Sequence, residues 1–224
     1  MASPARQHKQ KVLAAQAAMS MSSDDDSVRG SAYELMLEQM GQQKRDLKSI
    51  KSMVAKNDAK ASMLPEWTGY IEGVLAADTG ATDSIIGQLL IWSIDVAEYD
   101  QAINIGTYML RHDIALPEQF ERDTVDAFAE ELADAWIKHD EPTITLVHLK
   151  QTLELVESYE LFDEVRAKLL RALGEASHQA GAKYETSIQY LDEAVSLNPR
   201  VGCKPLLSKL QKLQLESLAN PDNS

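Results

Sequence analysis

The chain has 224 residues, of which 44% are hydrophobic, and a formal net charge of −13. That length and composition are typical of a globular protein with one large or two small domains. No apolar run approaches the roughly 20 residues that a membrane-spanning helix needs, so we expect no membrane contact. The single cysteine, Cys203, excludes an intrachain disulfide and a multi-cysteine zinc site, which fits a reducing cytoplasm.

Charge is distributed unevenly along the chain. Residues 67–150 hold four basic and sixteen acidic residues, whereas residues 1–66 hold ten basic and eight acidic ones. Within the latter, KRDLKSIKSMVAKNDAK at 44–60 has six basic residues against two acids. Phosphates favour Lys and Arg, so any DNA contact is expected in the first third of the chain. By composition alone, this basic run is either a solvated, salt-bridged helix face or a surface that meets a polyanion.

Residues 1–30 are predicted to be a flexible basic arm followed by a linker. Arg6, His8, Lys9 and Lys11 open the arm, and no acid precedes Asp24. SMSSDDDSVRGS at 20–31 is rich in Ser and Asp and has almost nothing apolar to bury, as is typical of a linker.

Residues 31–64 are predicted to be a basic amphipathic region, with one long helix from about residue 31 to residue 56. Ser31 precedes Glu34 by three residues, as in a capping box. The apolar residues expected to face inward recur every three to four positions: Tyr33, Met36, Met40, Leu47, Ile50 and Val54. Basic side chains flank this stripe, with Lys44, Lys48 and Lys51 along one edge and Arg45 and Lys56 further round.

Residues 65–145 are predicted to form an acidic helical core. Pro65 is expected to open a helix, and either Thr82 or Asp83 is expected to cap another. The helices are predicted at 66–76, from 82 or 83 through 96, at 99–112 and at 124–139. The segment SIIGQLLIWSIDV at 84–96 is apolar nearly all round, which indicates a buried helix.

Residues 146–218 are predicted to be C-terminal helical hairpins, and residues 219–224 a frayed tail. Helices are expected at 146–156, 163–180, 184–197 and 206–218. No segment shows convincing strand alternation, so the predicted fold class is all-α: a basic arm and a long amphipathic helix, then a multi-helix bundle. YETSIQYLDEAVSLNP at 184–199 resembles both residues 99–110 and a tetratricopeptide-repeat helix, which predicts repeat-like (TPR-like) hairpins without a regular array.

Motifs of catalysis are absent. The sequence has no Walker A motif and no G-x-S-x-G, H-E-x-x-H or C-x-x-C. We therefore expect no catalytic residue, no cofactor and no ATPase activity in this chain.

Four carboxylates share one face of the 124–139 helix and are metal candidates: Asp123, Asp126, Glu130 and Asp134. They suggest a Mg²⁺ site of a nuclease. The favoured interpretation is a solvated acidic face, opposite a core stripe of Val125, Phe128, Leu132 and Trp136. Carboxylates along one helix diverge, whereas a metal site needs ligands that converge from different elements. Mg²⁺ is expected only if the chain is a nuclease.

Several segments, in their order along the chain, resemble the small terminase subunit of peduovirus-type temperate tailed phages, over roughly residues 3–200. In the first half these are SPAR at 3–6, His8, YELML at 33–37, Arg45, Leu47, Lys48, Ile50, LPEW at 64–67, GVL at 73–75 and Asp83. Further along they are Ile85, Trp92, Asp95, Ala102, Tyr108, TLELVE at 152–157, DEVRAKL at 163–169 and Gly174.

The resemblance implies a role in genome packaging in the cytoplasm of the infected bacterium. Such subunits recognise the cohesive-end region of double-stranded phage DNA, form oligomers that are commonly rings, and hand the DNA to a large ATPase subunit. The family is also labelled the terminase endonuclease subunit, yet no nuclease motif is visible here, so cleavage is expected to belong to the large subunit or to require it.

One departure from the family concerns the C-terminus. The members that we can compare end in a long Lys/Arg-rich tail, and this sequence ends without one. The candidate DNA-binding residues are therefore those of the arm and of the basic run: Arg6, His8, Lys9, Lys11, Lys44, Arg45, Lys48, Lys51, Lys56 and Lys60. Two alternatives stay open, a metal-dependent endonuclease that cuts concatemeric phage DNA and a helical-repeat scaffold that binds only proteins.

Overall fold

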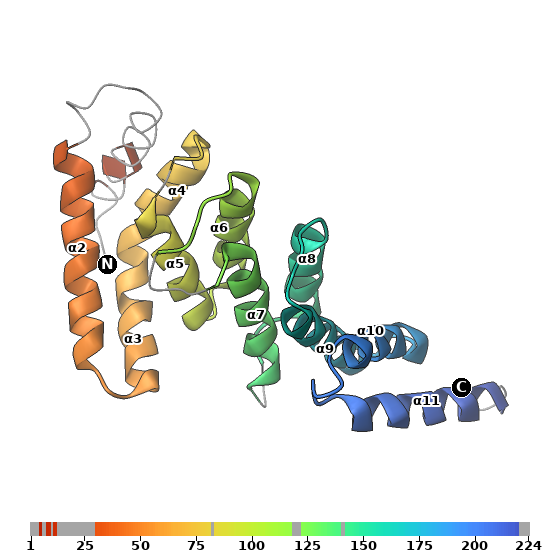
Figure 1. The fold of residues 1–224 in the computed structure, drawn as a ribbon. Helices are drawn as coiled ribbons and strands as arrows, with labels where there is room; N and C mark the ends of the chain where they lie inside the picture. The colour runs from red at the N-terminus through yellow and green to blue at the C-terminus, as the bar shows by residue number, and fades with distance from the viewer. Residues whose placement is uncertain are drawn as a thin grey trace. The chain divides into compact units, whose positions relative to one another are not determined.

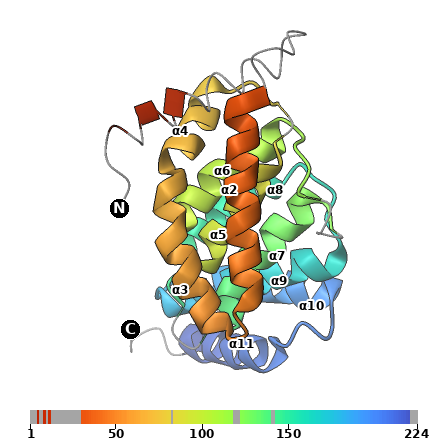
Figure 2. The ribbon, with the colours of Figure 1, turned by 90° about the vertical axis from the view of Figure 1, so that its left-hand side faces the viewer.

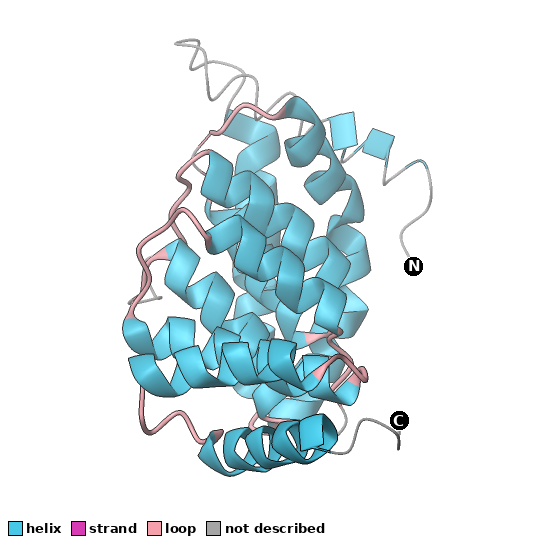
Figure 3. Cartoon of the chain, turned by 90° about the vertical axis from the view of Figure 1, so that its right-hand side faces the viewer, coloured by secondary structure: helices cyan, strands magenta, loops and turns pink. Residues whose placement is uncertain are grey.

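A computed structural model describes residues 5, 8, 9, 11, 12, 30–81, 83–117, 122–139 and 142–219. Within these ranges all regular secondary structure is helical (Figure 3), which confirms the all-α prediction. None of the helices in this part combines the length and apolar character needed to cross a bilayer. Arg6, nearly all of the predicted linker and residues 220–224 lie outside the described residues.

The chain divides into two compact units, residues 1–124 and residues 125–224. The division falls within the region that the sequence predicts as the acidic core. The helices of the first unit (Figure 1) are α2 (Gly30–Ser49), α3 (Met53–Met63), the 3₁₀ helix η1 (Leu64–Trp67), α4 (Thr68–Ala77), α5 (Ser84–Asp95) and α6 (Tyr99–Arg111).

The long helix predicted over residues 31–56 is in fact two helices, and this prediction was wrong. The backbone N–H of Ile50 donates to the carbonyl of Leu47 at 3.2 Å as α2 ends. Ser52 has an extended backbone and caps α3, its side chain accepting from the backbone N–H of Ala55 at 3.3 Å. The chain therefore reverses between residues 49 and 53, and α2 and α3 lie side by side as an antiparallel hairpin (Figures 1 and 2).

Helix α5 supplies much of the first unit's core. Ile85, Ile86, Leu89 and Leu90 are fully buried, as the apolar sequence of this segment predicts. α5 packs against α6, α3 and η1. Burial of four branched aliphatic side chains stabilises the unit by about 1.5–3 kcal/mol each. The α2–α3 hairpin therefore packs, through α3, on the buried helix α5 and on η1.

Asp83 caps α5 and joins it to two other helices. Its Oδ1 accepts from the backbone N–H of Ile85 at 2.9 Å, which confirms the predicted cap. The hydroxyls of Tyr33 on α2 and Tyr70 on α4 donate to its two carboxylate oxygens at 3.2 and 2.6 Å. Burial raises the pKa of all three side chains. This shared carboxylate holds the N-terminal part of α2 in place.

A second contact holds the middle of α2. The buried indole N–H of Trp67 in η1 donates to the side-chain oxygen of Gln43 at 2.8 Å. Met36, Met40 and Leu47 of the predicted stripe are buried beside it along the same face of α2. Together with the Asp83 contact, this fixes which face of α2 points outward.

The second unit contains α7 (Thr124–Ile137, whose first residue belongs to the first unit), α8 (Leu146–Val156), α9 (Asp163–Gln179), α10 (Tyr184–Leu197) and α11 (Lys204–Ala219). α9 packs on α8 and α10, and α10 packs on α11. Gly174 of α9 lets α10 approach closely, because a Cβ there would lie only 2.6 Å from Leu191. The successive helices form hairpins, while the TPR-like detail stays a prediction.

Candidate nucleic-acid interface

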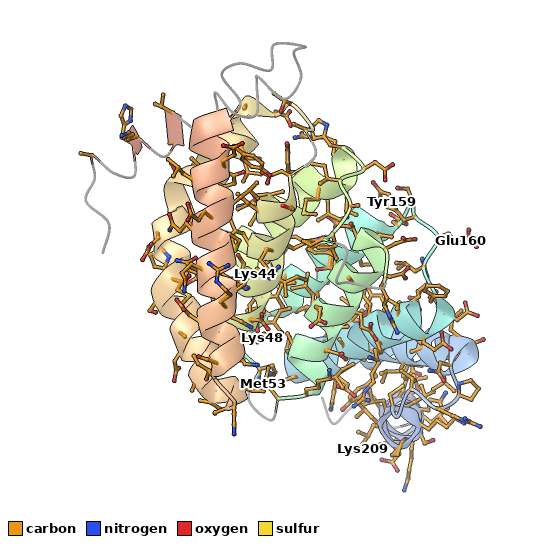
Figure 4. All side chains as sticks on the ribbon, turned by 60° about the vertical axis from the view of Figure 1, so that its left-hand side comes forward. Lys44, Lys48, Met53, Tyr159, Glu160 and Lys209 are labelled. Atoms are coloured by element: carbon orange, nitrogen blue, oxygen red, sulfur yellow. The ribbon has the colours of Figure 1, made fainter. Side chains whose placement is uncertain are left out.

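The exposed edge of α2 carries the basic side chains that the sequence singles out. Lys48 is exposed and Lys44, one turn earlier, is half-buried. Figure 4 shows both side chains on one side of α2, following one another toward the turn into α3. Lys51 is exposed within that turn. The structure therefore places Lys44 and Lys48 along one edge of α2, as the helical spacing predicts, whereas Lys51 lies beyond the end of this helix.

Arg45 lies on the outer face of α2 and is also exposed. Its guanidinium donates to the side-chain oxygen of Gln42, with Nη2 at 2.8 Å and Nε at 3.3 Å. Gln42 in turn donates to Asp46 at 2.7 Å. The amide orients the guanidinium without neutralising its charge, so Arg45 remains a cation directed to solvent.

Lys60 does not belong to this exposed set, contrary to the sequence prediction. It is only 9% exposed, and its Nζ lies 2.6 Å from Oδ2 of Asp95, the last residue of α5. A charge held in a largely desolvated pair contributes to packing of α3 on α5 and has little surface left for a phosphate. Lys56, one turn earlier on α3, is half-buried.

The N-terminal arm is described at only a few positions. His8, Lys9 and Lys11 are exposed and helical. The ammonium of Lys11 lies 2.9 Å from Glu72 of α4, and both side chains are about half exposed. Such a surface pair contributes little to stability and is readily exchanged for another anion. Arg6 lies outside the described residues.

The acidic residues of α7 are not a solvated face, and that interpretation was wrong for most of them. Asp126 and Asp134 are 3% and 7% exposed, and Asp123 alone of the four candidates is exposed. The carboxylate of Asp126 accepts the backbone N–H of Phe162 at 3.1 Å. Asp126 is therefore a structural acceptor within the second unit.

Lys168 of α9 is the partner that the sequence did not reveal. Its ammonium lies 2.7 Å from Oε1 of Glu130 and 3.2 Å from Oδ1 of Asp134, which also pairs with Lys138 at 2.7 Å. Burial alone would lower the pKa of Lys168, but the two carboxylates outweigh it and raise that pKa. We call Glu130, Asp134 and Lys168 the α7–α9 ion cluster. The available sequence signal was a lysine between two apolar residues, Ala167 and Leu169, both of which are buried in the structure.

Metal binding by these carboxylates finds no geometric support. In the described ranges, no group of three or more His, Cys, Asp or Glu side chains converges to hold an ion. Three of the four candidates already bond to a backbone amide or an ammonium. Dependence on Mg²⁺ remains an untested prediction.

The described residues form an all-helical protein with a basic hairpin in its first unit and an acid-rich helix in its second. The family described as "Phage small terminase subunit" matches residues 37–164, more than half of the chain. The "Terminase, endonuclease subunit" of Escherichia phage P2 is 30% identical over 219 residues, which are 95% of this chain and 85% of that protein. No solved structure matches the chain significantly. The chain belongs to the phage small terminase subunit family.

Proposed function

We propose that this small terminase subunit is a non-enzymatic DNA-recognition and adaptor protein. It binds the cohesive-end region of double-stranded phage DNA in the host cytoplasm, assembles into a ring-like homo-oligomer and delivers the DNA to the large ATPase subunit for packaging. Family membership supports the packaging role. The single observation that favours DNA contact in this chain is the exposed basic edge of the α2–α3 hairpin.

Physical chemistry supports this use of the hairpin. Arg45 and Lys48 are exposed on α2, whose opposite face is fixed by Trp67 and Asp83, and Lys51 is exposed in the turn that follows. Exposed cations can neutralise phosphates, and each neutralised phosphate releases a counterion. One hairpin makes only a few such contacts. Several copies in one oligomer would act together and raise the avidity.

Charge reversal on the hairpin tests the DNA contact. The variant Lys44→Glu/Lys48→Glu/Lys51→Glu is expected to lose more than about tenfold in affinity for phage end DNA at moderate salt. The matched control reverses three exposed lysines of α11 in the second unit, Lys204, Lys209 and Lys212, and so changes the net charge equally. Binding by the hairpin variant at wild-type strength, or an equal loss in the control, would reject the hairpin assignment.

Oligomerisation and the adaptor role have their own tests. Native mass measurement of the purified chain is expected to show a closed oligomer, and a monomer would contradict the ring. Residues 67–150, with four basic and sixteen acidic residues, offer acidic surface for a basic partner, so retention of the large subunit in a pull-down is expected to weaken at high salt. Retention that is independent of salt would contradict an electrostatic contact.

A share in DNA cleavage is the second candidate, favoured by the name of the phage P2 relative, "Terminase, endonuclease subunit". If this chain cuts DNA by itself, the purified protein should show Mg²⁺-dependent cutting that Asp126→Ala/Glu130→Ala abolishes. The structural roles of Asp126 and Glu130 require a folding control, such as far-UV circular dichroism of the variant. Absence of cutting without the large subunit would exclude independent nuclease activity.

A further inference from the structure

The turn between α2 and α3 presents two adjacent apolar side chains to solvent. Met53, the first residue of α3, is 61% exposed, and Val54 is 73% exposed. The sequence predicts that Val54 faces inward, and this prediction was wrong. Single exposed apolar residues are ordinary on protein surfaces, whereas two neighbours at the end of a hairpin form a protruding apolar point. We call residues 48–54 the hairpin tip.

Basic residues flank that point on its α2 side. Lys48 and Lys51 of the hairpin tip are both exposed, and the first turn of α3 contains no acidic residue. In Figure 4, Lys48 lies between Lys44 and Met53 along the path toward the turn. An apolar point bordered by cations complements a surface in which apolar groups lie between rows of negative charge. Duplex DNA has that pattern, with stacked bases between two phosphate backbones.

The hairpin tip is also held firmly. The Ser52 cap and the hydrogen bond from Ile50 to Leu47 define the turn. The Lys60–Asp95 pair fixes the far end of α3 on α5, and the Trp67–Gln43 bond fixes α2 on η1. Because these contacts hold both helices in place, the side chains of the hairpin tip can press against a bound ligand without displacing the helices behind them.

We propose that Met53 and Val54 form a wedge that inserts between two base pairs from the minor groove and kinks the DNA bound by the hairpin. Lys48 and Lys51 then neutralise the phosphates beside the opened step. Apolar wedges of this kind unstack one base step and bend the duplex by about 20–90° toward the major groove. Methionine suits the role, since its unbranched, flexible side chain fills irregular gaps. This inference rests on the proposed DNA-binding function and adds a mode of binding to it.

The wedge and the lysines should have separable effects. Phosphate contacts supply most of the affinity, whereas the wedge changes the shape of the DNA. Met53→Ala/Val54→Ala should therefore keep binding within about tenfold of wild type while it removes the bend. Both side chains are exposed, so the substitution leaves the core of the first unit intact.

The experiment uses the full chain with two DNA probes. One carries donor and acceptor dyes at its ends, whose energy transfer reports bending; the other carries 2-aminopurine, whose fluorescence rises when a base unstacks. Wild type should raise both signals, and Met53→Leu/Val54→Ile should preserve them. Met53→Ala/Val54→Ala should bind with neither change. The matched control, Leu215→Ala/Leu218→Ala, removes two equally exposed apolar side chains of α11 and should behave as wild type.

The outcomes separate this inference from the function on which it rests. If wild type binds DNA but neither bends nor unstacks it, or if Met53→Ala/Val54→Ala bends it fully, the wedge is wrong and the proposed function stands. If wild type shows no DNA affinity at low salt, both are wrong. If Met53→Ala/Val54→Ala leaves the DNA signals unchanged but dissociates the oligomer, the hairpin tip is a contact between copies of the chain and the wedge is rejected.

Discussion

The α2–α3 hairpin and the α7–α9 ion cluster use the same kinds of charge in opposite ways. On the hairpin, Arg45 is oriented by a neutral amide, and Lys48 and Lys51 are exposed. In the ion cluster, Lys168 lies within 2.7 Å of Glu130 and 3.2 Å of Asp134, and both acids are largely buried. Cations that meet solvent are available to a polyanion, whereas cations that meet buried carboxylates stabilise the fold. The surroundings of a charge, rather than its density in the sequence, decide its role.

Breaking the α7–α9 ion cluster should have the largest effect on the stability of the protein. Lys168→Ala leaves Glu130 and Asp134 close together and without their shared ammonium. Because the cluster is partly solvated, the expected loss in the free energy of unfolding is about 2–4 kcal/mol, at or somewhat below the range for breaking fully buried pairs. Urea denaturation would measure it. The neutral variant Lys168→Met/Glu130→Gln/Asp134→Asn should recover most of the loss, and a triple variant as unstable as Lys168→Ala would contradict the electrostatic explanation.

Lys60 tests the same difference between exposed and buried cations. The sequence groups it with the exposed basic residues of the hairpin, whereas the structure buries it beside Asp95. Lys60→Met should lower the free energy of unfolding by about 1–3 kcal/mol, since it leaves Asp95 without its partner at a partly buried position. Its DNA affinity, measured well below the melting temperature, should match wild type. A loss of affinity with unchanged stability would return Lys60 to the DNA-binding set.

The pH dependence of stability provides a smaller effect. The pKa of Lys168 is raised above its ordinary value of 10.5, so its favourable contribution is complete below that pH and is lost as pH rises through the raised pKa. The difference in unfolding free energy between wild type and the neutral triple variant should therefore shift against wild type above about pH 10.5. The pKa values of Tyr33 and Tyr70 are also raised by burial, but both residues are common to the two proteins. A difference that is constant with pH would contradict the raised pKa.

The smallest expected effect is the reactivity of the Cys203 thiol in the folded protein. Its thiol is 1% exposed, lies 3.8 Å from the carbonyl of Leu191, and has its pKa raised by burial. A chromogenic disulfide reagent should react slowly with the folded protein and rapidly after denaturation. Rapid reaction in the folded state would show that the second unit opens around α10 and α11.

Several elements could be predicted from the sequence because local signals agreed. The segment 84–96 is apolar all round and preceded by Asp83, which is the observed cap of α5. The predicted bounds of α8 and α10 are those of the structure. The break between α2 and α3 was missed because Ile50 and Val54 continue the apolar spacing through the turn. Ser52 was the signal that could have revealed it, since serine favours helix N-caps over helix interiors.

The candidate interface was predictable only in part, because burial depends on partners far away in the sequence. Lys48 and Lys60 are both lysines of the same basic run, and the local sequence does not show which one is exposed. In the structure, Lys60 pairs with Asp95 of another helix, whereas Lys48 is exposed. In α7, the predicted stripe assumed one buried face. Four alanines, Ala127, Ala129, Ala133 and Ala135, are buried around the helix. The buried acids bond to groups far along the chain, Asp126 to the backbone of Phe162 and Asp134 to Lys168, which the local sequence does not show.

The salt dependence of DNA binding tests the central claim most directly. Affinity for phage end DNA would be measured over a range of salt concentrations for wild type and for Lys48→Gln/Lys51→Gln, with Lys60→Met as the control for a buried lysine. If Lys48 and Lys51 each neutralise a phosphate, the slope of log affinity against log salt should become shallower by about 0.9 per lysine lost, while the control keeps the wild-type slope. An unchanged slope in the Lys48→Gln/Lys51→Gln variant would contradict DNA binding by the exposed edge of the α2–α3 hairpin.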